Sequence, residues 1–417
     1  MKRLLLISYV FPPAGGAGVQ RALKMVKYLP VHGWQAVVVT PRRPSVPVVD
    51  RSYLRDLPPG LVVERLPSLE PGAGGGEDPA PAGAAARLRR LAVELAFPDR
   101  YLLWLATALP GTLAAIRRHR VRAVMVTAPP FSSFILGAAA AGLAGLPLVL
   151  DFRDDWSGFF TKGFQAHGGG RMWKRAVLSL ERRLVRRAAR VVGTTRAMCR
   201  RLQRLHGGPP EKYVWIPNGY DPDDFRFLAH EPLRPPAPGG PIRLLHSGTV
   251  FQSHPLDELW AALARMEPKE RARFTVEVAG RVVPGMVVDP GLPGLRVRRL
   301  PYEPHQAALR RMARAHVLVA TLADLPGLSR MVPGKLFEYL AVRRPVLMIA
   351  PPGEATAIVE ATGAGAVVFP GQTQKLVGVL RGWLQQPPRP LGPPPRLFDR
   401  RQLAGCLAAE LEAVAAG

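Results

Sequence analysis

The sequence predicts an α/β protein of two domains, each a parallel sheet with helices on both faces. Short runs rich in Val, Ile and Leu alternate with longer segments of helical periodicity along the chain. The runs are almost continuously apolar, as expected for strands that are buried on both faces. The alternation stops at a Pro- and Gly-rich tract and restarts after it. A length of 417 residues also suits two domains of roughly 200 residues each.

The first half contains seven predicted strands. They are Leu4 to Ser8, Ala36 to Thr40, Leu61 to Arg65, Ala123 to Thr127, Pro147 to Asp151, Arg190 to Gly193 and Tyr213 to Ile216. Between the first two, an apolar stripe at spacings of three and four predicts a helix that faces the sheet, formed by Ala22, Leu23, Val26 and Leu29. The apolar stretch from Phe134 to Leu150 is too short to span a bilayer, and we interpret it as a helix running into a buried strand.

The second half contains six predicted strands. They are Ile242 to His246, Phe274 to Ala279, Leu295 to Arg299, His316 to Ala320, Val346 to Ile349 and Ala366 to Phe369. The Pro- and Gly-rich segment 231–241 is the predicted linker between a domain of residues 1–230 and a domain of residues 242–395. A final helix, Asp399 to Ala415, is predicted within segment 396–417. The Gly-, Pro- and Ala-rich tract Glu70 to Ala86 predicts a flexible surface loop.

The composition indicates a globular, strongly basic protein, with 47% apolar residues and a formal net charge of +26. Three origins of the charge remain open: coding bias towards Arg, an anionic membrane or phosphate-bearing substrate, and nucleic acid. The two cysteines, Cys199 and Cys406, lack the spacing of a zinc site or a disulfide framework, which fits a cytoplasmic protein. The basic N-terminus has too short an apolar run for a signal peptide and predicts a strand.

A glycine-rich turn follows the first strand, where Gly16 and Gly18 precede a helix. Glycines allow close approach of a ligand, and a helix N-terminus offers unpaired N–H groups to an anion, so this turn predicts a phosphate site. The dinucleotide fingerprint is incomplete, because Arg21 stands where a third glycine is needed and Thr40 where an acid is needed. The alternative interpretation is a tight turn required only for packing.

An acidic segment around one arginine, Asp151 to Trp156, follows the fifth predicted strand at its carboxyl end, where open α/β sheets place ligands. Asp151, Arg153 and Asp154 are therefore candidates for binding sugar hydroxyls or organising the reacting centre. A salt-linked turn and a metal site are the alternatives, although no accompanying histidine or metal-binding spacing supports the second.

Further candidate binding residues lie in a loop that leads into a helix near the end of the second half. Arg330 and Lys335 supply positive charge and Gly334 exposes backbone N–H groups, a combination that predicts a diphosphate site. Glu338, about one turn into the helix, is predicted to accept hydrogen bonds from ribose hydroxyls. The alternative for Glu338 is an ordinary surface glutamate.

Five motifs in order resemble the family-four glycosyltransferases over nearly the whole chain. They are the opening ISYVFPPAGGAGVQRALKMVKYLPVHGW, then DFRDDW, IPNGYDPDDF, LLHSGTV, and PGKLFEYLAVRRPVL with the later PPGEA and GAG. The resemblance implies a GT-B fold, in which two Rossmann-like domains face each other across a cleft. It also implies an acceptor site mainly on the first domain, a donor site mainly on the second, and a C-terminal helix that crosses back to the first.

By this resemblance, several residues would contact a nucleotide-sugar donor. Gly16 and Gly18 match the loop that approaches the donor phosphates, the HSGT segment contributes Gly248 and Thr249, and Glu338 matches the ribose-binding glutamate. Two positions depart from the family pattern. Arg330 replaces a glutamate expected near the transferred sugar, and segment 251–254 lacks an expected phosphate-binding arginine, whose charge Arg330 or Lys335 would supply.

The family also implies a retaining transfer with the nucleotide sugar as substrate and no cofactor. We expect no metal, because cations and helix N-termini can stabilise a departing diphosphate. The acceptor is expected to be a sugar, a lipid-linked precursor or a polysaccharide precursor, and nucleic acid is not expected as a partner. Peripheral contact with an anionic membrane is predicted from Arg87 to Arg90 with Leu91 to Phe97, and from Arg182, Arg183, Arg186 and Arg187. The alternative functions are a catalytically silent nucleotide-binding module, which Arg330 favours, and a nucleotide-sugar epimerase.

Overall fold

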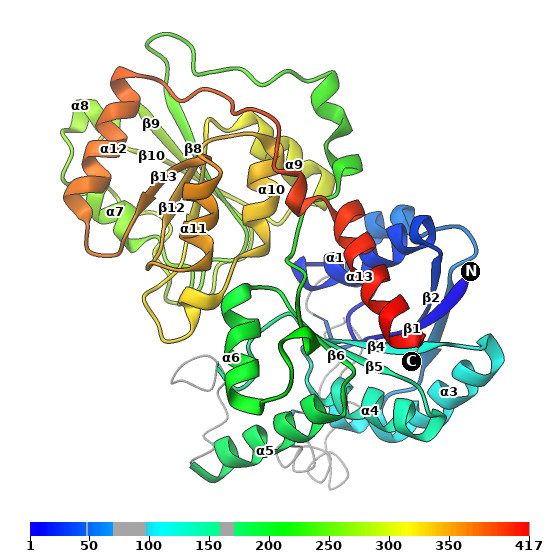
Figure 1. The fold of residues 1–417 in the computed structure, drawn as a ribbon. Helices are drawn as coiled ribbons and strands as arrows, with labels where there is room; N and C mark the ends of the chain where they lie inside the picture. Colours follow the sequence, from blue (N-terminus) through cyan, green and yellow to red (C-terminus); the bar gives the residue numbers. More distant parts are fainter. Residues whose placement is uncertain (47–48, 70–96, 100, 159–170, 417) are drawn as a thin grey trace, which may run out of the picture. The chain divides into compact units, whose positions relative to one another are not determined.

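The computed structural model describes residues 1–46, 49–69, 97–99, 101–158 and 171–416. The chain forms two compact units, one of Met1–Pro217 with Arg400–Gly417 and the other of Asn218–Asp399 (Figure 1). The loop predicted for Glu70 to Ala86, and the segment 87–96 of the predicted membrane contact, lie outside the described residues. Within these residues each unit is built on its own sheet, and no sheet continues from one unit into the other.

The sheet of the first unit has seven parallel strands in the order β3-β2-β1-β4-β5-β6-β7. The strands are β1 (Lys2–Ser8), β2 (Trp34–Pro41), β3 (Val62–Leu66), β4 (Ala123–Ala128), β5 (Leu148–Phe152), β6 (Arg190–Gly193) and β7 (Tyr213–Trp215). Successive residues of β1 alternate between two apolar clusters, with Leu4 and Leu6 in one and Leu5 and Ile7 in the other. Both faces of this sheet are therefore buried, which explains the continuous apolar runs.

Helices cover both faces of this first sheet (Figure 1). They are α1 (Ala17–Tyr28), α3 (Leu102–His119), α4 (Ser132–Ala144), α5 (Arg171–Arg187), α6 (Arg196–His206) and α13 (Arg400–Ala415), with the short 3₁₀ turns η1 (Leu29–His32), η2 (Arg51–Asp56) and η3 (Pro210–Lys212). The C-terminal α13 packs beside α1 through Leu403, Leu407 and Leu411. The final helix thus belongs to the first unit, although its sequence follows the second.

The sheet of the second unit has six parallel strands in the order β10-β9-β8-β11-β12-β13. The strands are β8 (Ile242–Ser247), β9 (Phe274–Ala279), β10 (Arg296–Leu300), β11 (Val317–Thr321), β12 (Val346–Ile349) and β13 (Gly365–Val368). The helices are α7 (Asp257–Ala264), α8 (Pro268–Arg271), α9 (His305–Arg314), α10 (Gly334–Val342), α11 (Glu354–Ala361) and α12 (Thr373–Gln385), with 3₁₀ turns η4 (Pro222–Ala229), η5 (Leu328–Arg330) and η6 (Arg396–Phe398). Two apolar clusters, one on each face, enclose this sheet as well.

All thirteen predicted strands are present, each within two residues of its predicted ends. The unit boundary differs from the predicted linker, because it falls between Pro217 and Asn218 and segment 231–241 belongs to the second unit. Apolar side chains of η4 and of Leu233 pack on the second core. Arg344 also donates a hydrogen bond to the carbonyl of Arg234 at 2.8 Å. These contacts hold a segment whose composition alone resembles a linker.

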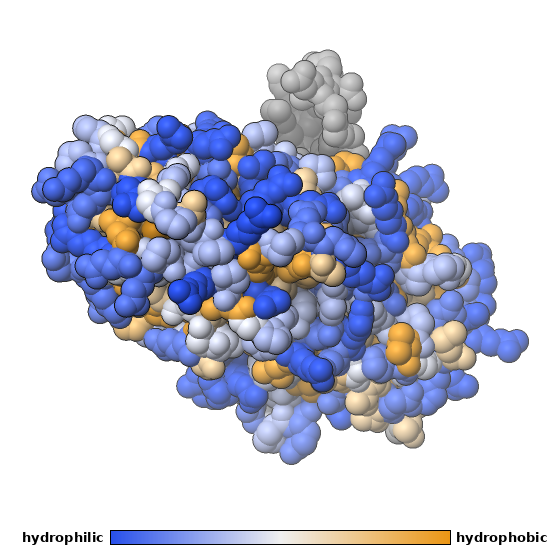
Figure 2. All heavy atoms as spheres, turned by 90° about the horizontal axis from the view of Figure 1, so that it is seen from above, coloured by the Kyte–Doolittle hydropathy of each residue, from blue (hydrophilic) through white to orange (hydrophobic). Residues whose placement is uncertain are grey.

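Within the described residues, no helix combines the length and the apolar character needed to cross a bilayer. The face drawn in Figure 2 is mostly hydrophilic, with its apolar residues in several small groups.

Candidate functional site

Each sheet reverses its strand order at one point, between β1 and β4 in the first unit and between β8 and β11 in the second. In open α/β sheets, ligands bind beyond the carboxyl ends of the strands at this switch point. Gly16 and Gly18 follow β1, and Gly248 and Thr249 follow β8. The fold therefore places the predicted glycines where a ligand would approach each sheet.

In the first unit, the glycine loop contacts the acidic segment that follows β5. The guanidinium of Arg153 donates hydrogen bonds to the carbonyl oxygens of Gly18 and Pro129. Gly16 is the N-cap of α1 and has a φ of 87°, a conformation that favours glycine. No side chain caps α1, so its first N–H groups are not occupied by a capping side chain. The structure brings together two predicted parts of the site, Gly18 and Arg153.

Asp151, one of the predicted catalytic residues, is buried and paired with other side chains. Its carboxylate is fully buried and forms a bidentate ion pair with Arg21, at 2.7 Å from Nη2 and 2.9 Å from Nε. Thr127 donates a further hydrogen bond to it at 2.7 Å. Arg21 also donates to the carbonyls of Ile216 and Pro217. The Arg21–Asp151 pair therefore ties α1 to β4, β5 and the segment that follows β7.

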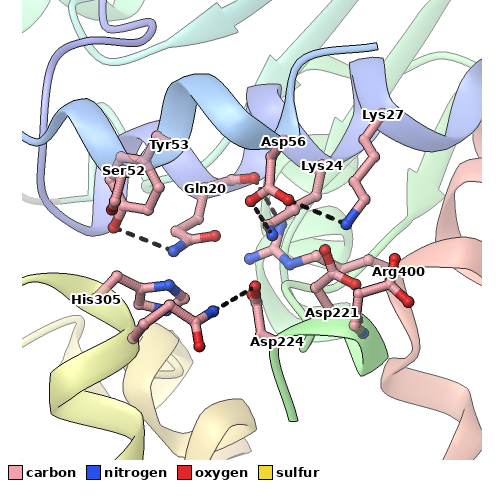
Figure 3. A network of polar contacts seen from close by, with 12 residues as sticks. Gln20, Lys24, Lys27, Ser52, Tyr53, Asp56, Asp221, Asp224, His305 and Arg400 are labelled. Carbon is pink, nitrogen blue, oxygen red and sulfur yellow. Dashed lines mark hydrogen bonds and ion pairs between the residues drawn. The ribbon is translucent and has the colours of Figure 1, made fainter. Parts of the chain in front are cut away.

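A second ion-pair group anchors α1 further along its length. The fully buried ammonium of Lys24 lies 2.7 Å from the carboxylate of Asp56, and that of Lys27 lies 3.1 Å from it. Figure 3 shows both lysine side chains pointing to Asp56. Because α1 is fixed at these points, the glycine loop that precedes it has a defined position.

Asp154 and Asp155 differ in their availability to a ligand. Asp155 is buried and paired with Arg201 at 2.7 Å. Asp154 is partly exposed, and none of the described residues donates a hydrogen bond to its carboxylate. Burial of the group raises the pKa of Asp154, the charge of Arg153 lowers it, and Asp155 raises it again. Asp154 is therefore the most exposed of the three acids of this segment.

A buried polar network anchors Ser157, the residue that follows the acidic segment. Glu181 of α5 accepts hydrogen bonds from the backbone N–H and the hydroxyl of Ser157, at 3.0 and 2.9 Å. His206 of α6 lies 2.6 Å from the same carboxylate. Sequence patterns carry no signal for this network, because its members come from a loop and two separate helices.

In the second unit, two glycine turns pack against each other at the ends of β8 and β9. Gly248 and Gly280 both have a φ of 127°. A Cβ on Gly280 would lie only 2.7 Å from the carbonyl oxygen of Gly248, so a side chain there would displace the turn. The backbone around Gly248 and Thr249 is thus shaped by the close approach of two main chains.

Lys335, the second residue of α10, reaches the end of β8. Its Nζ lies 3.1 Å from Nε2 of His246, which is fully buried. Although the Lys335 side chain as a whole stays partly exposed, burial of its ammonium lowers the pKa of Lys335 to about 7. Among the described residues, no carboxylate pairs with this ammonium. The group is consequently a cation site without a counter-ion.

Glu338 lies one turn further along α10 and accepts a hydrogen bond from His305 of α9. The distance between Oε1 and Nε2 is 3.0 Å, and the Glu338 side chain is 22% exposed. No described residue bonds to Oε2, so one carboxylate oxygen is held while the other is available. His305 was missed in the sequence analysis because it stands outside every recognised motif.

Arg330 ends η5, just before the loop that leads into α10, and its side chain is partly exposed. The N-terminus of α11 packs on η5. A Cβ at Gly353 would lie 2.2 Å from the carbonyl oxygen of Ser329. Only glycine permits this approach, so Gly353 fixes the turn that carries Arg330.

Comparisons with known proteins agree with this architecture. Residues 15–219 match the family described as glycosyl transferase 4-like domain. No curated protein matches the sequence. Similar solved structures include HepE from Anabaena in complex with UDP and glucose, with a TM-score of 0.57, 15% identity and coverage of 100% of this chain and 98% of the other.

Two further structures are similar over almost their whole length. WaaG, described as a glycosyltransferase involved in lipopolysaccharide biosynthesis, has a TM-score of 0.56 at 16% identity, with 99% and 95% of the two chains covered. A glycosyltransferase from Rickettsia africae has a TM-score of 0.54 at 11% identity, with 100% and 93% covered. Residues 15–219 thus form a domain that matches the glycosyl transferase 4-like family, and the similarity to these structures shows that the chain has the GT-B fold of two Rossmann-like domains.

Proposed function

We propose that the chain transfers a sugar from a UDP-sugar to an acceptor hydroxyl, with retention at the anomeric carbon. The observation that carries this proposal is the position of Lys335 and Glu338, which lie one turn apart on α10. The ammonium of Lys335 has no carboxylate partner among the described residues, and one carboxylate oxygen of Glu338 accepts no hydrogen bond from them. A diphosphate with an adjoining ribose needs this combination of groups. The complexes of HepE with UDP and UDP-glucose support uridine as the base.

In this mechanism the bond between the anomeric carbon and the diphosphate oxygen breaks while the acceptor oxygen bonds to that carbon. The acceptor proton passes to the departing phosphate oxygen, so no side-chain base is required. Lys335, Arg330 and the first N–H groups of α10 stabilise the negative charge that develops on the diphosphate. We propose that no metal is needed, and expect that chelation with EDTA leaves the transfer rate unchanged.

In the first unit, we assign the contact with sugar or acceptor hydroxyls to Asp154 rather than to Asp151. The side chain of Asp154 is partly exposed, whereas the carboxylate of Asp151 is buried in an ion pair with Arg21. Arg153 orients the glycine loop through Gly18. We therefore expect Asp154→Asn to lower transfer without unfolding the protein.

The proposal is tested by thermal stabilisation with a panel of nucleotides, since a ligand that binds only the native state raises its stability. We expect UDP and a UDP-sugar to raise the melting temperature more than ADP or GDP. Glu338→Ala should weaken UDP binding by roughly tenfold to a hundredfold, because hydrogen bonds to a charged group contribute about 1.5–3 kcal/mol. Glu360→Ala, on the exposed side of α11, is the matched control and should bind UDP as the parent does.

Two other outcomes would assign a different function. Binding of the UDP-sugar without hydrolysis or transfer to any tested acceptor would favour a silent binding module, in which Arg330 replaces a group required for transfer. Conversion of the UDP-sugar to an epimer without an acceptor would favour an epimerase.

We also propose that the acceptor is presented at an anionic membrane, as a lipid-linked or polysaccharide precursor. Support comes from α5, where Arg182, Arg183, Arg186 and Arg187 are all exposed. Basic residues near an anionic surface contribute about 1 kcal/mol each. Sedimentation with anionic and with neutral vesicles at low salt tests this, and equal recovery in the two supernatants would contradict it.

A further inference from the structure

The surroundings of Lys335 differ from those of a typical structural cation. Lys24 and Lys27 in the first unit lie against a carboxylate, as buried and partly buried cations usually do. Lys335 instead contacts an imidazole, with 3.1 Å between its Nζ and Nε2 of His246. The other side of the ammonium faces Gly248, where an added Cβ would lie 3.6 Å from Nζ. The group is therefore held in position without being neutralised.

The two neighbouring histidines supply no negative charge. His246 is fully buried, and burial, followed by the charges of Lys335 and His254, lowers its pKa well below 6.5. Burial and the charge of Lys335 lower the pKa of His254 to about 3. Both rings are thus neutral at pH 7, and Nε2 of His246 accepts the hydrogen bond when Lys335 carries its proton.

Other titratable groups on the packed elements are occupied elsewhere or do not act on Lys335. On α10 itself, Glu338 is bonded to His305 of α9. The hydroxyl of Tyr339 accepts a hydrogen bond from the backbone N–H of Ser247 at 3.0 Å, and its single proton is shared between the carbonyls of Ser247 and Val319. Asp224 of η4 accepts a hydrogen bond from Gln306 of α9. The two imidazoles are consequently the groups in electrostatic contact with Lys335.

We infer that Lys335 takes up a proton when the diphosphate of the donor binds, and that His246 is the positioning residue that holds its amine for this purpose. The inference rests on the proposed function, since it concerns the same donor. In the free protein the desolvated amine is largely neutral above neutral pH. A diphosphate placed beside it supplies the missing counter-ion and makes the ammonium the stable form. Binding therefore removes one proton from solution, and release of the product UDP returns it.

The size of the effect follows from the free-state pKa of Lys335, about 7. At pH 8 about nine-tenths of the amine is neutral, and UDP itself has lost its last phosphate proton, which has a pKa of about 6. Binding at pH 8 should then take up about 0.9 proton. By linkage, the affinity for UDP should fall about tenfold between pH 8 and pH 9.

The experiment is isothermal titration of the whole protein with UDP at pH 8, in buffers of different ionisation enthalpy, repeated at pH 9. Lys335→Arg keeps the positive charge but cannot lose its proton, so it should bind UDP with proton uptake near zero and with a flat affinity between the two pH values. His246→Gln keeps a neutral acceptor beside Nζ and should retain the uptake.

The outcomes separate the inference from the proposed function. Uptake near 0.9 in the parent that disappears in Lys335→Arg supports the inference. UDP binding by the parent without uptake, or with uptake that persists in Lys335→Arg, overturns it and leaves the proposed function intact. If the parent binds no UDP at any pH, the proposed donor site itself is wrong. The parent's own affinities at pH 8 and 9 decide the question if the arginine variant does not fold.

Discussion

Replacing Lys335 with methionine should stabilise the ligand-free protein while removing its affinity for UDP. Burial lowers the pKa of Lys335 from 10.5 to about 7, so keeping the proton in the folded state at pH 7 is unfavourable by up to about 4 kcal/mol. Methionine has a similar length and no charge, but it leaves Nε2 of His246 without its partner, which costs about 1–3 kcal/mol. A net gain of roughly 1–3 kcal/mol remains, equivalent to a melting temperature higher by roughly 2–10 °C.

The dependence of this gain on pH identifies its cause. Between pH 7 and pH 10.5 the unfolded parent binds more protons than the folded parent, so the stability of the parent rises with pH across that window. The methionine variant has no such group. The advantage of Lys335→Met should thus be complete below pH 7 and, as the pH approaches 10.5, give way to the loss of about 1–3 kcal/mol caused by the unpaired Nε2 of His246.

Thermal unfolding of parent and variant at pH 6.5, 8 and 10 measures this difference. Lys269→Met on α8 is the control, because Lys269 is exposed and its loss should change stability by less than about 0.5 kcal/mol at every pH. A variant that is less stable than the parent at pH 6.5, or whose gain is the same at pH 10, would refute the claim that desolvation of Lys335 opposes folding.

Two further substitutions test the scaffold around the site. Gly353→Ala places a Cβ 2.2 Å from the carbonyl oxygen of Ser329, so we expect thermal unfolding to show a loss of about 1–3 kcal/mol in stability, together with reduced transfer. The control is Gly382→Ala, which should stabilise α12 slightly because nothing lies within 4 Å of the added Cβ. Equal effects of the two substitutions would count against the packing argument. Arg21→Met leaves the buried Asp151 carboxylate unpaired and should lower stability by about 3–5 kcal/mol in denaturant titration, whereas an unchanged midpoint would mean that Asp151 is free for catalysis.

The strands could be predicted from the sequence because both faces of each sheet are buried. Continuous apolar runs such as Leu4 to Ile7 are typical of strands in that environment, and the loops that follow them locate the glycines of the site. Gly16, Gly18 and Gly248 could thus be placed at strand ends without knowledge of the strand order.

Contacts between distant residues could not be predicted in this way. Asp151 stands in a motif with exposed-looking charges, yet Arg21, 130 residues away, buries and pairs it. His246 and Lys335 are 89 residues apart and meet only because β8 lies at the switch point of its sheet. The predicted linker was misplaced for a related reason, since its Pro and Gly content indicated a joint while Leu233 and the side chains of η4 pack on the second core.

The choice of imidazole rather than carboxylate beside Lys335 has a physical rationale that links stability to function. A carboxylate at position 246 would neutralise the ammonium and favour folding, but it would also repel a diphosphate and compete for the same cation. A neutral ring accepts one hydrogen bond and fixes the direction of the amine, but it supplies no negative charge that would hold the proton in the absence of a ligand. We therefore expect the folded state to be less stable than the same chain with an apolar residue at position 335. We expect a bound diphosphate to relieve that deficit, so that desolvation of Lys335 in the free protein would be recovered as donor affinity.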